Sequence, residues 1–121
     1  MIKALFLDID GTLVSFETHR VGEPTRNALA EARRRGLLLF IATGRHRCDL
    51  NNLGDLAFDG YVTLNGQYCY DARGVIYCRS IDPNDIRTAV GLIEREPFPC
   101  LFIEEDRMYI CLLYTSPSPR D

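Results

Sequence analysis

The sequence of 121 residues has none of the features that mark membrane or nucleic-acid-binding proteins. No apolar stretch is long enough to span a membrane. The net charge is −3 and there is no large basic patch, which argues against nucleic acid as a partner. The only cationic run is Arg33-Arg34-Arg35, and at the end of an expected helix such a run is typical of solvated surface. The N-terminus is strand-like and contains Asp8, unlike a signal peptide.

The cysteines give no sign of a disulfide framework or a zinc site. There are five of them, an odd number, at wide spacings and without a C-x-x-C pair. Free thiols in a reducing compartment are the default for such a pattern, which predicts a cytoplasmic protein. The composition, 46% hydrophobic and 26% charged, is that of an ordinary globular domain.

Apolar runs and helical patterns alternate through the first half of the chain. Buried strands are expected at 3–9, 37–42 and 61–64, with a helix from about Glu23 to Gly36 and a weakly helical segment at 48–56. This order predicts an α/β fold in which crossovers connect parallel strands. A hairpin with a four-residue turn at 71–74, a helix at 83–95 and a second hairpin at 101–112 are expected after them.

Polar residues come directly after each of the three expected parallel strands. Asp8 and Asp10 come after the first strand in Asp8-Ile9-Asp10-Gly11-Thr12, Thr43 and Gly44 follow the second, and Asn65-Gly66 follows the third. Because ligands bind at the carboxyl ends of parallel strands, we expect these groups to converge on one site. Two carboxylates beside backbone N–H groups suit a hard cation together with a phosphate.

The Asp-x-Asp-Gly-Thr segment allows three interpretations. Asp and Gly are common in turns, so it could be a simple turn. It also matches part of a calcium loop, with Asp8, Asp10, Gly11 and Glu17 at suitable spacing, although Phe6 fails as the first ligand. In the third interpretation one Asp is a nucleophile that accepts a phosphoryl group.

Three segments together resemble the haloacid dehalogenase superfamily, specifically the Cof-type (subfamily IIB) phosphatases. Asp8-Ile9-Asp10-Gly11-Thr12-Leu13-Val14 resembles the first motif and Ala42-Thr43-Gly44-Arg45 the second, while 59–66 resembles the strand before the Asn-Gly of that subfamily. The resemblance covers about residues 2–110. It implies a Rossmann-like parallel three-layer core, incomplete here, and the beginning of an α+β cap domain.

The resemblance also implies a mechanism. Asp8 would attack phosphorus to give an aspartyl-phosphate, and Asp10 would act as general acid and then general base. Magnesium would bind an oxygen of Asp8 and the backbone carbonyl of Asp10. The substrate would be a small phosphorylated metabolite, with a sugar phosphate the first expectation.

The remaining site residues are assigned to phosphate and substrate. Backbone N–H groups up to Gly11, the Thr43 hydroxyl and the Gly44 N–H would hold phosphate oxygens. Thr12 would brace the loop through its hydroxyl. Two assignments stay open: Arg45 contacts substrate or pairs with a neighbouring acid, and Asn65 and Gly66 line the substrate side or form a plain turn.

The sequence departs from the family pattern beyond these three motifs. The family's third-motif lysine has no counterpart, since Lys3 is the only lysine, and the Gly-Asp motif with a further acid is missing as well. We therefore expect the chain as written to be inactive or nearly so. A phosphomutase-like phosphotransferase and a non-catalytic binding fragment are the alternative functions.

The expected domain layout has three parts. Residues 1–81 would be the N-terminal part of the core, 82–110 the start of the cap, and 111–121 a non-native tail that resembles translated vector sequence. A genuine disordered Ser/Pro tail is the alternative. The first strand would be an open hydrophobic edge, which favours aggregation.

Overall fold

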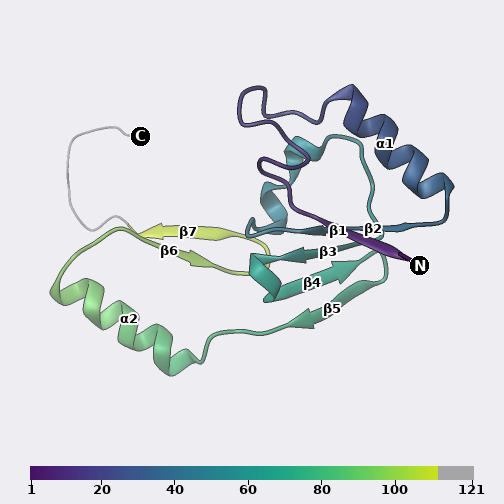
Figure 1. Cartoon of the computed structure of the whole chain (residues 1–121). Coiled ribbons are helices and arrows are strands. Elements are labelled where there is room, and N and C mark those ends of the chain that lie inside the picture. Colours follow the sequence, from purple (N-terminus) through teal and green to yellow (C-terminus); the bar gives the residue numbers. More distant parts are fainter. Residues whose placement is uncertain (112–121) are drawn as a thin grey trace. The chain divides into compact units, whose positions relative to one another are not determined.

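The structure, a computed structural model, describes residues 1–111 as two units, one from Met1 to Arg79 and one that begins at Ser80. In the order of the chain its strands and α-helices are β1 Ala4–Leu7, α1 Glu23–Arg34, β2 Leu38–Ala42, β3 Gly60–Thr63, β4 Tyr68–Asp71, β5 Gly74–Cys78, α2 Pro83–Arg95, β6 Cys100–Ile103 and β7 Met108–Cys111 (Figure 1).

The first unit is built on a five-stranded sheet with the order β1-β2-β3-β4-β5. The first three strands are parallel, with Phe6 opposite Phe40 and Phe40 opposite Gly60, and the last two add as antiparallel neighbours. The helix α1 connects the parallel strands β1 and β2, and β4 and β5 extend the sheet as an antiparallel hairpin. This arrangement confirms the predicted α/β class. The three parallel strands end at one edge of the sheet, so the residues after them are neighbours.

Several local expectations were wrong in detail. The first strand ends at Leu7 rather than Ile9, because the chain turns back on the carbonyl of Ile9. The segment at 48–56 forms two short 3₁₀ turns, η1 Arg47–Asp49 and η2 Asn51–Leu53, in place of one helix. The β4–β5 hairpin pairs Asp71 with Gly74, so its turn has two residues rather than four.

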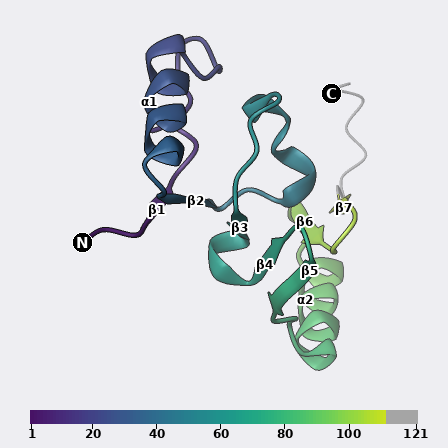
Figure 2. The same ribbon diagram turned by 90° about the vertical axis from the view of Figure 1, so that its right-hand side faces the viewer.

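The core lies on the sheet face that α1 covers. Residues alternate between faces along a strand, and the inward set includes Leu39 and Ile41 of β2, which pack with Leu29 of α1 and Ile9. Figure 2 shows α1 above β1 and β2, with Leu29 the residue of α1 that is buried. The N-terminal Pro24 and the acidic Glu23 in the first turn favour the start of this helix.

The other face of β1 and β2 is apolar and open. Phe6 is 62% exposed and Leu38 48% exposed, and the Phe6 ring stacks on Phe40 with centroids 4.7 Å apart. Within residues 1–111, β1 has a strand on one side only. A bare apolar face beside a free strand edge favours association between chains.

Stacked aromatic rings join the parallel and antiparallel parts of the sheet. Tyr61 of β3 and Tyr70 of β4 lie directly opposite each other with ring centroids 4.9 Å apart, and the Tyr68 ring centroid is 5.8 Å from that of Tyr70. Burial raises the pKa of Tyr70, and its aromatic neighbour Tyr61 adds to the shift.

The second unit contains α2 and the β6–β7 hairpin. The Asp82 carboxylate accepts a hydrogen bond from the Asn84 N–H at 2.8 Å and so caps α2, which starts with Pro83. Ile93 is the buried residue of this helix. Among residues 1–111 no helix is both long and apolar enough to cross a membrane. The predicted tail lies outside the described residues except for Cys111, which ends β7.

The open face predicts that the 121-residue chain self-associates and binds a hydrophobic dye. Replacing Phe6 by Ser should reduce both, because it removes a large exposed apolar ring. As the matched control, Ile41→Ala should leave association unchanged and lower the free energy of unfolding by about 2–5 kcal/mol, since Ile41 is fully buried. Analytical ultracentrifugation and denaturant titration measure the two effects. A monomer with a sharp thermal transition and no dye binding would contradict the prediction.

Candidate functional site

A tight loop after β1 places both motif carboxylates in solvent. Ile9 is fully buried, and its carbonyl accepts hydrogen bonds from the N–H groups of Thr12, Leu13 and Val14 at 3.2, 3.0 and 2.9 Å. Gly11 has φ of +80°, a left-handed conformation that favours glycine, and its N–H donates to the Val14 carbonyl at 2.9 Å. The buried Ile9 thus separates two exposed acids, Asp8 and Asp10.

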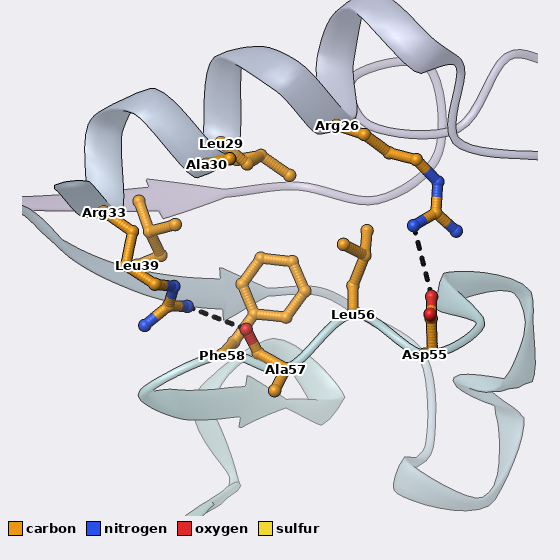
Figure 3. Close-up of a pocket in the computed structure, with 9 residues that line it drawn as sticks. All are labelled: Arg26, Leu29, Ala30, Arg33, Leu39, Asp55, Leu56, Ala57 and Phe58. Atoms are coloured by element: carbon orange, nitrogen blue, oxygen red, sulfur yellow. Dashed lines mark hydrogen bonds and ion pairs between the residues drawn. The ribbon is translucent and has the colours of Figure 1, made fainter.

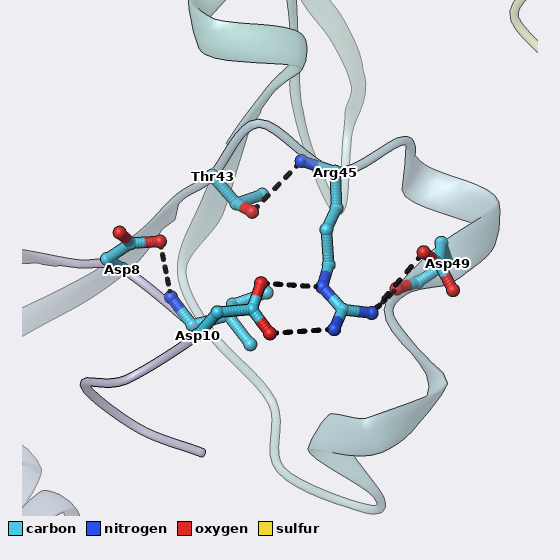
Figure 4. A network of polar contacts seen from close by, with 6 residues as sticks. Asp8, Asp10, Thr43, Arg45 and Asp49 are labelled. Carbon is cyan, nitrogen blue, oxygen red and sulfur yellow. Dashed lines mark hydrogen bonds and ion pairs between the residues drawn. The ribbon is translucent and has the colours of Figure 1, made fainter. Parts of the chain in front are cut away.

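The Asp8 side chain is held by the backbone of the next residue. The Ile9 N–H donates to Asp8 Oδ1 at 2.7 Å (Figure 4). This local bond fixes one carboxylate oxygen against the loop.

The ends of β2 and β3 are joined by main-chain hydrogen bonds. The Asn65 N–H donates to the Thr43 carbonyl at 3.0 Å and the Leu64 N–H to the Arg45 carbonyl at 3.2 Å. The buried Thr43 hydroxyl accepts from the Arg45 N–H at 3.0 Å, and as an acceptor there it keeps its own proton for donation. These bonds make the loop from Thr43 to Arg45 a rigid part of the site.

Gly44 permits the Asn65 side chain to lie against it. A Cβ built on Gly44 would come within 3.1 Å of Asn65 Oδ1. The turn that brings Asn65 there is left-handed, with φ of 51° at Leu64, 55° at Asn65 and 100° at Gly66. Asn and Gly tolerate this conformation, so the Asn-Gly pair has a structural reason in addition to any contact with substrate.

Arg45 pairs with Asp10 through a two-pronged contact. Its Nε donates to Asp10 Oδ2 at 2.9 Å and its Nη2 to Oδ1 at 2.7 Å (Figure 4). These bonds hold the pKa of Asp10 below its usual range, while the small loss of hydration opposes the shift and the charge of His19 adds to it. The same pairing raises the pKa of Arg45. The structure thus favours the pairing interpretation of Arg45 over a free, substrate-facing guanidinium.

Asp49 is a member of the network that the sequence did not reveal. The Arg45 Nη1 donates to the Asp49 carbonyl at 3.0 Å and lies 3.3 Å from its Oδ2. The i,i+4 spacing of Arg45 and Asp49 is the signal that could have indicated the contact. The sequence predicts only weak helical character for this segment, and no motif there includes Asp49.

The structure therefore brings together residues from the three strand ends. Asp10 connects to the second strand end through Arg45, and that loop is bonded to Asn65. Thr12 lies on the same loop as the two acids, and its N–H bonds within the loop. Within residues 1–111 no group of three or more His, Cys, Asp or Glu side chains could hold a metal ion, so the calcium-loop ligands are not gathered.

A separate pocket of about 440 Å³ lies away from these residues, between α1 and the segment 55–58 (Figure 3). Its walls include apolar side chains such as Leu29 and Leu56, and its arginines are already paired. Arg26 lies 3.1 Å from Asp55, and Arg33 donates to the Ala57 carbonyl at 2.8 Å. The predicted site residues do not line it.

The parallel strands β1 to β3, with polar residues at their carboxyl ends and an Asp-x-Asp turn after β1, define an α/β protein. Residues 5–112 match the family model of the haloacid dehalogenase-like hydrolases. The chain belongs to that family.

Solved structures and curated relatives agree with this assignment. The chain is similar to the subclass IIB sugar phosphatase BT4131, with a TM-score of 0.82 and 46% identity over 90% of this chain and 44% of that one. BT1666 from Bacteroides thetaiotaomicron gives a TM-score of 0.84 and 35% identity over 95% and 43%. The HMP-PP phosphatase of Shigella flexneri is 36% identical over 92 residues, 74% of this chain and 34% of that protein. The chain spans less than half the length of these relatives.

The Asp10–Arg45 contact predicts a shifted titration. In Arg45→Gln the pKa of Asp10 should rise toward its ordinary value, because the two donated bonds and the nearby charge are lost. The pairing contributes stability at pH above the ordinary pKa of a carboxyl group and loses it as the pH falls through the lowered one. NMR titration of the Asp10 carboxyl carbon measures the shift. An unchanged pKa in the variant would show that the contact is absent in solution.

Replacing Gly11 by Ala should destabilise the loop. The residue has positive φ, and a Cβ there would lie 2.7 Å from the Phe16 ring. The exposed ring can move aside, so the backbone conformation dominates and the cost is about 1–2 kcal/mol. Chemical denaturation measures it, with Gly22→Ala as control since φ there is −74° and the new Cβ would find its nearest atom at 3.7 Å. Equal effects of the two changes would contradict the prediction.

Proposed function

We propose that this chain supplies the nucleophile and the acid–base group of a Mg²⁺-dependent phosphoric monoester hydrolase of the Cof-like type. The observation that carries the proposal is the loop that holds Asp8 and Asp10 in solvent beside the Thr43–Arg45 loop. The names of two similar proteins, a sugar phosphatase and an HMP-PP phosphatase, support a small phosphorylated metabolite as substrate. A sugar phosphate is the first candidate.

Asp8 is the proposed nucleophile. A carboxylate oxygen attacks phosphorus, the bond from phosphorus to the ester oxygen breaks, and the phosphoryl group is left on Asp8. Water then attacks this aspartyl-phosphate and releases inorganic phosphate. Since the Ile9 N–H holds Oδ1, we assign the attack to Oδ2.

Asp10 is the proposed acid and base. It gives a proton to the leaving alcohol in the first step and takes one from water in the second. Arg45 favours the ionised form, which is the form that the second step needs. The negative charge of a bound phosphate raises the pKa of a neighbouring carboxyl group, which supplies the protonated form for the first step.

Fixed donors hold the transferring phosphate. The Gly44 N–H and the Thr43 hydroxyl are assigned to its oxygens, and one such donor contributes about 3 kcal/mol to transition-state stabilisation. The Gly11 N–H, expected from the sequence to be a third donor, is instead bonded to the Val14 carbonyl. Thr12 braces the loop, and Asn65 with Gly66 borders the leaving-group side.

Mg²⁺ fits the oxygen donors at this turn. The Asp8 carboxylate and the Asp10 carbonyl are the hard ligands that this cation prefers, and when bound it neutralises charge between nucleophile and phosphate. These donors alone do not complete an octahedral site. The resemblance assigns the remaining acids and a charge-balancing lysine to sequence that these 121 residues do not include.

We assign residues 1–81 to the core and 82–110 to the beginning of a cap, which would select the substrate. The thiols of Cys69, Cys78 and Cys100, which are not in disulfide bonds, support a reducing compartment such as the cytoplasm.

A chimera tests the proposal. Residues 1–110 would replace the matching part of BT4131, with p-nitrophenyl phosphate and sugar phosphates as substrates. We expect Mg²⁺-dependent hydrolysis that Asp8→Asn lowers by at least ~10³-fold and Asp10→Asn by about 10²–10⁴-fold. The 121-residue chain alone should stay at background. A folded chimera without activity, or activity that survives Asp8→Asn, would overturn the assignment.

A further inference from the structure

We infer that Asp49 is a positioning residue that anchors Arg45, so that Arg45 holds the Asp10 carboxylate in place and does not itself bind the phosphate. The catalytic role in this inference rests on the proposed function. The contacts among Asp49, Arg45 and Asp10 do not depend on it.

All three nitrogens of the Arg45 guanidinium are engaged. Nε and Nη2 contact Asp10, and Nη1 contacts the carbonyl and carboxylate of Asp49. The planar fork of a guanidinium matches a carboxylate in this two-pronged way. A phosphate oxygen could reach most of these donors only by displacing one of the two acids.

The Arg45 backbone is fixed as well. Its N–H bonds to the Thr43 hydroxyl and its carbonyl accepts from Leu64. The side chain is 26% exposed, against 43% for Asp10 and 54% for Asp49. Arg45 is therefore the least exposed of the three and sits between two acids that are more open to solvent.

Asp49 fixes the orientation of the Arg45 guanidinium group. It lies in η1, whose first residue follows His46, and the His46 side chain accepts the Cys48 N–H at 3.0 Å. The short turn is thus fixed by its own cap. Because Asp49 holds Nη1, the two remaining guanidinium nitrogens face Asp10. The guanidinium group is planar and rigid, so the position of Asp49 determines where Arg45 holds the Asp10 carboxylate.

The test follows the Arg45 Nε–H signal by ¹⁵N NMR in the 121-residue chain, assigned by its loss in Arg45→Lys. We expect hydrogen exchange at this site to be slower than at Arg26, whose ion pair with Asp55 is more exposed. In Asp49→Asn the exchange should become about threefold faster, the size expected for loss of one partly exposed ion pair. Asp49→Glu should restore much of the protection. Asp55→Asn, the matched control, should leave the Arg45 signal unchanged.

Inorganic phosphate with Mg²⁺ provides the second arm. The Gly44 amide signal should move, while the Arg45 Nε–H signal stays in place. Movement of the Arg45 signal with phosphate would make it a ligand-binding group and overturn the inference, as would unchanged exchange in Asp49→Asn. If the Gly44 signal does not respond, the proposed phosphate site fails, but the comparison of Asp49 variants still decides the inference. Should Asp49→Asn not fold, Asp49→Ser takes its place, and unchanged exchange at Arg45 in that variant overturns the inference.

Discussion

Burial of Ile9 is the constraint on which the rest of the site depends. Its side chain belongs to the core with Leu39 and Ile41, and its carbonyl gathers the amides of the loop. An apolar residue between two acids forces the acids outward on either side. The same packing that stabilises the sheet therefore sets the position of Asp8 and Asp10. Ile9 therefore contributes both to the stability of the fold and to the geometry of the candidate site.

The core of the fold could be predicted from the sequence because its signals are local. Continuous apolar runs indicated the buried strands, and Pro24 and Gly36 bounded α1 closely. The short turns after Arg45 could not be predicted in the same way. The segment around Asp49 has no strong periodicity, and the capping of η1 by His46 depends on one local side-chain contact.

The hairpin turn shows a second limit of local signals. Asp and Gly are typical turn residues, so Asp71 and Gly74 were both assigned to the turn of the β4–β5 hairpin. The structure pairs them across the two strands instead. Composition alone does not decide whether such residues end a strand or belong to the turn itself.

For the candidate site, the sequence predicted which residues follow the strand ends, but it revealed neither Asp49 nor the contacts between the side chains. Asp8, Asp10, Thr43 and Asn65 were expected at adjacent strand ends, which follows from parallel topology alone. The contact between Arg45 and Asp10 joins residues 35 positions apart, and two interpretations of Arg45 remained open until the side chains were placed. The choice between them depends on rotamers and on Asp49, which no motif includes.

The aromatic stack across β3 and β4 has a consequence for spectroscopy. The chain contains no tryptophan, so its near-ultraviolet circular dichroism arises from tyrosine and phenylalanine. Rings held in a fixed asymmetric arrangement give such signals. Tyr61 and Tyr70 form a stack of this kind, with Tyr68 tilted beside Tyr70, at the junction where the sheet changes from parallel to antiparallel. The near-ultraviolet circular dichroism of these tyrosines thus reports whether the β4–β5 hairpin has paired with β3.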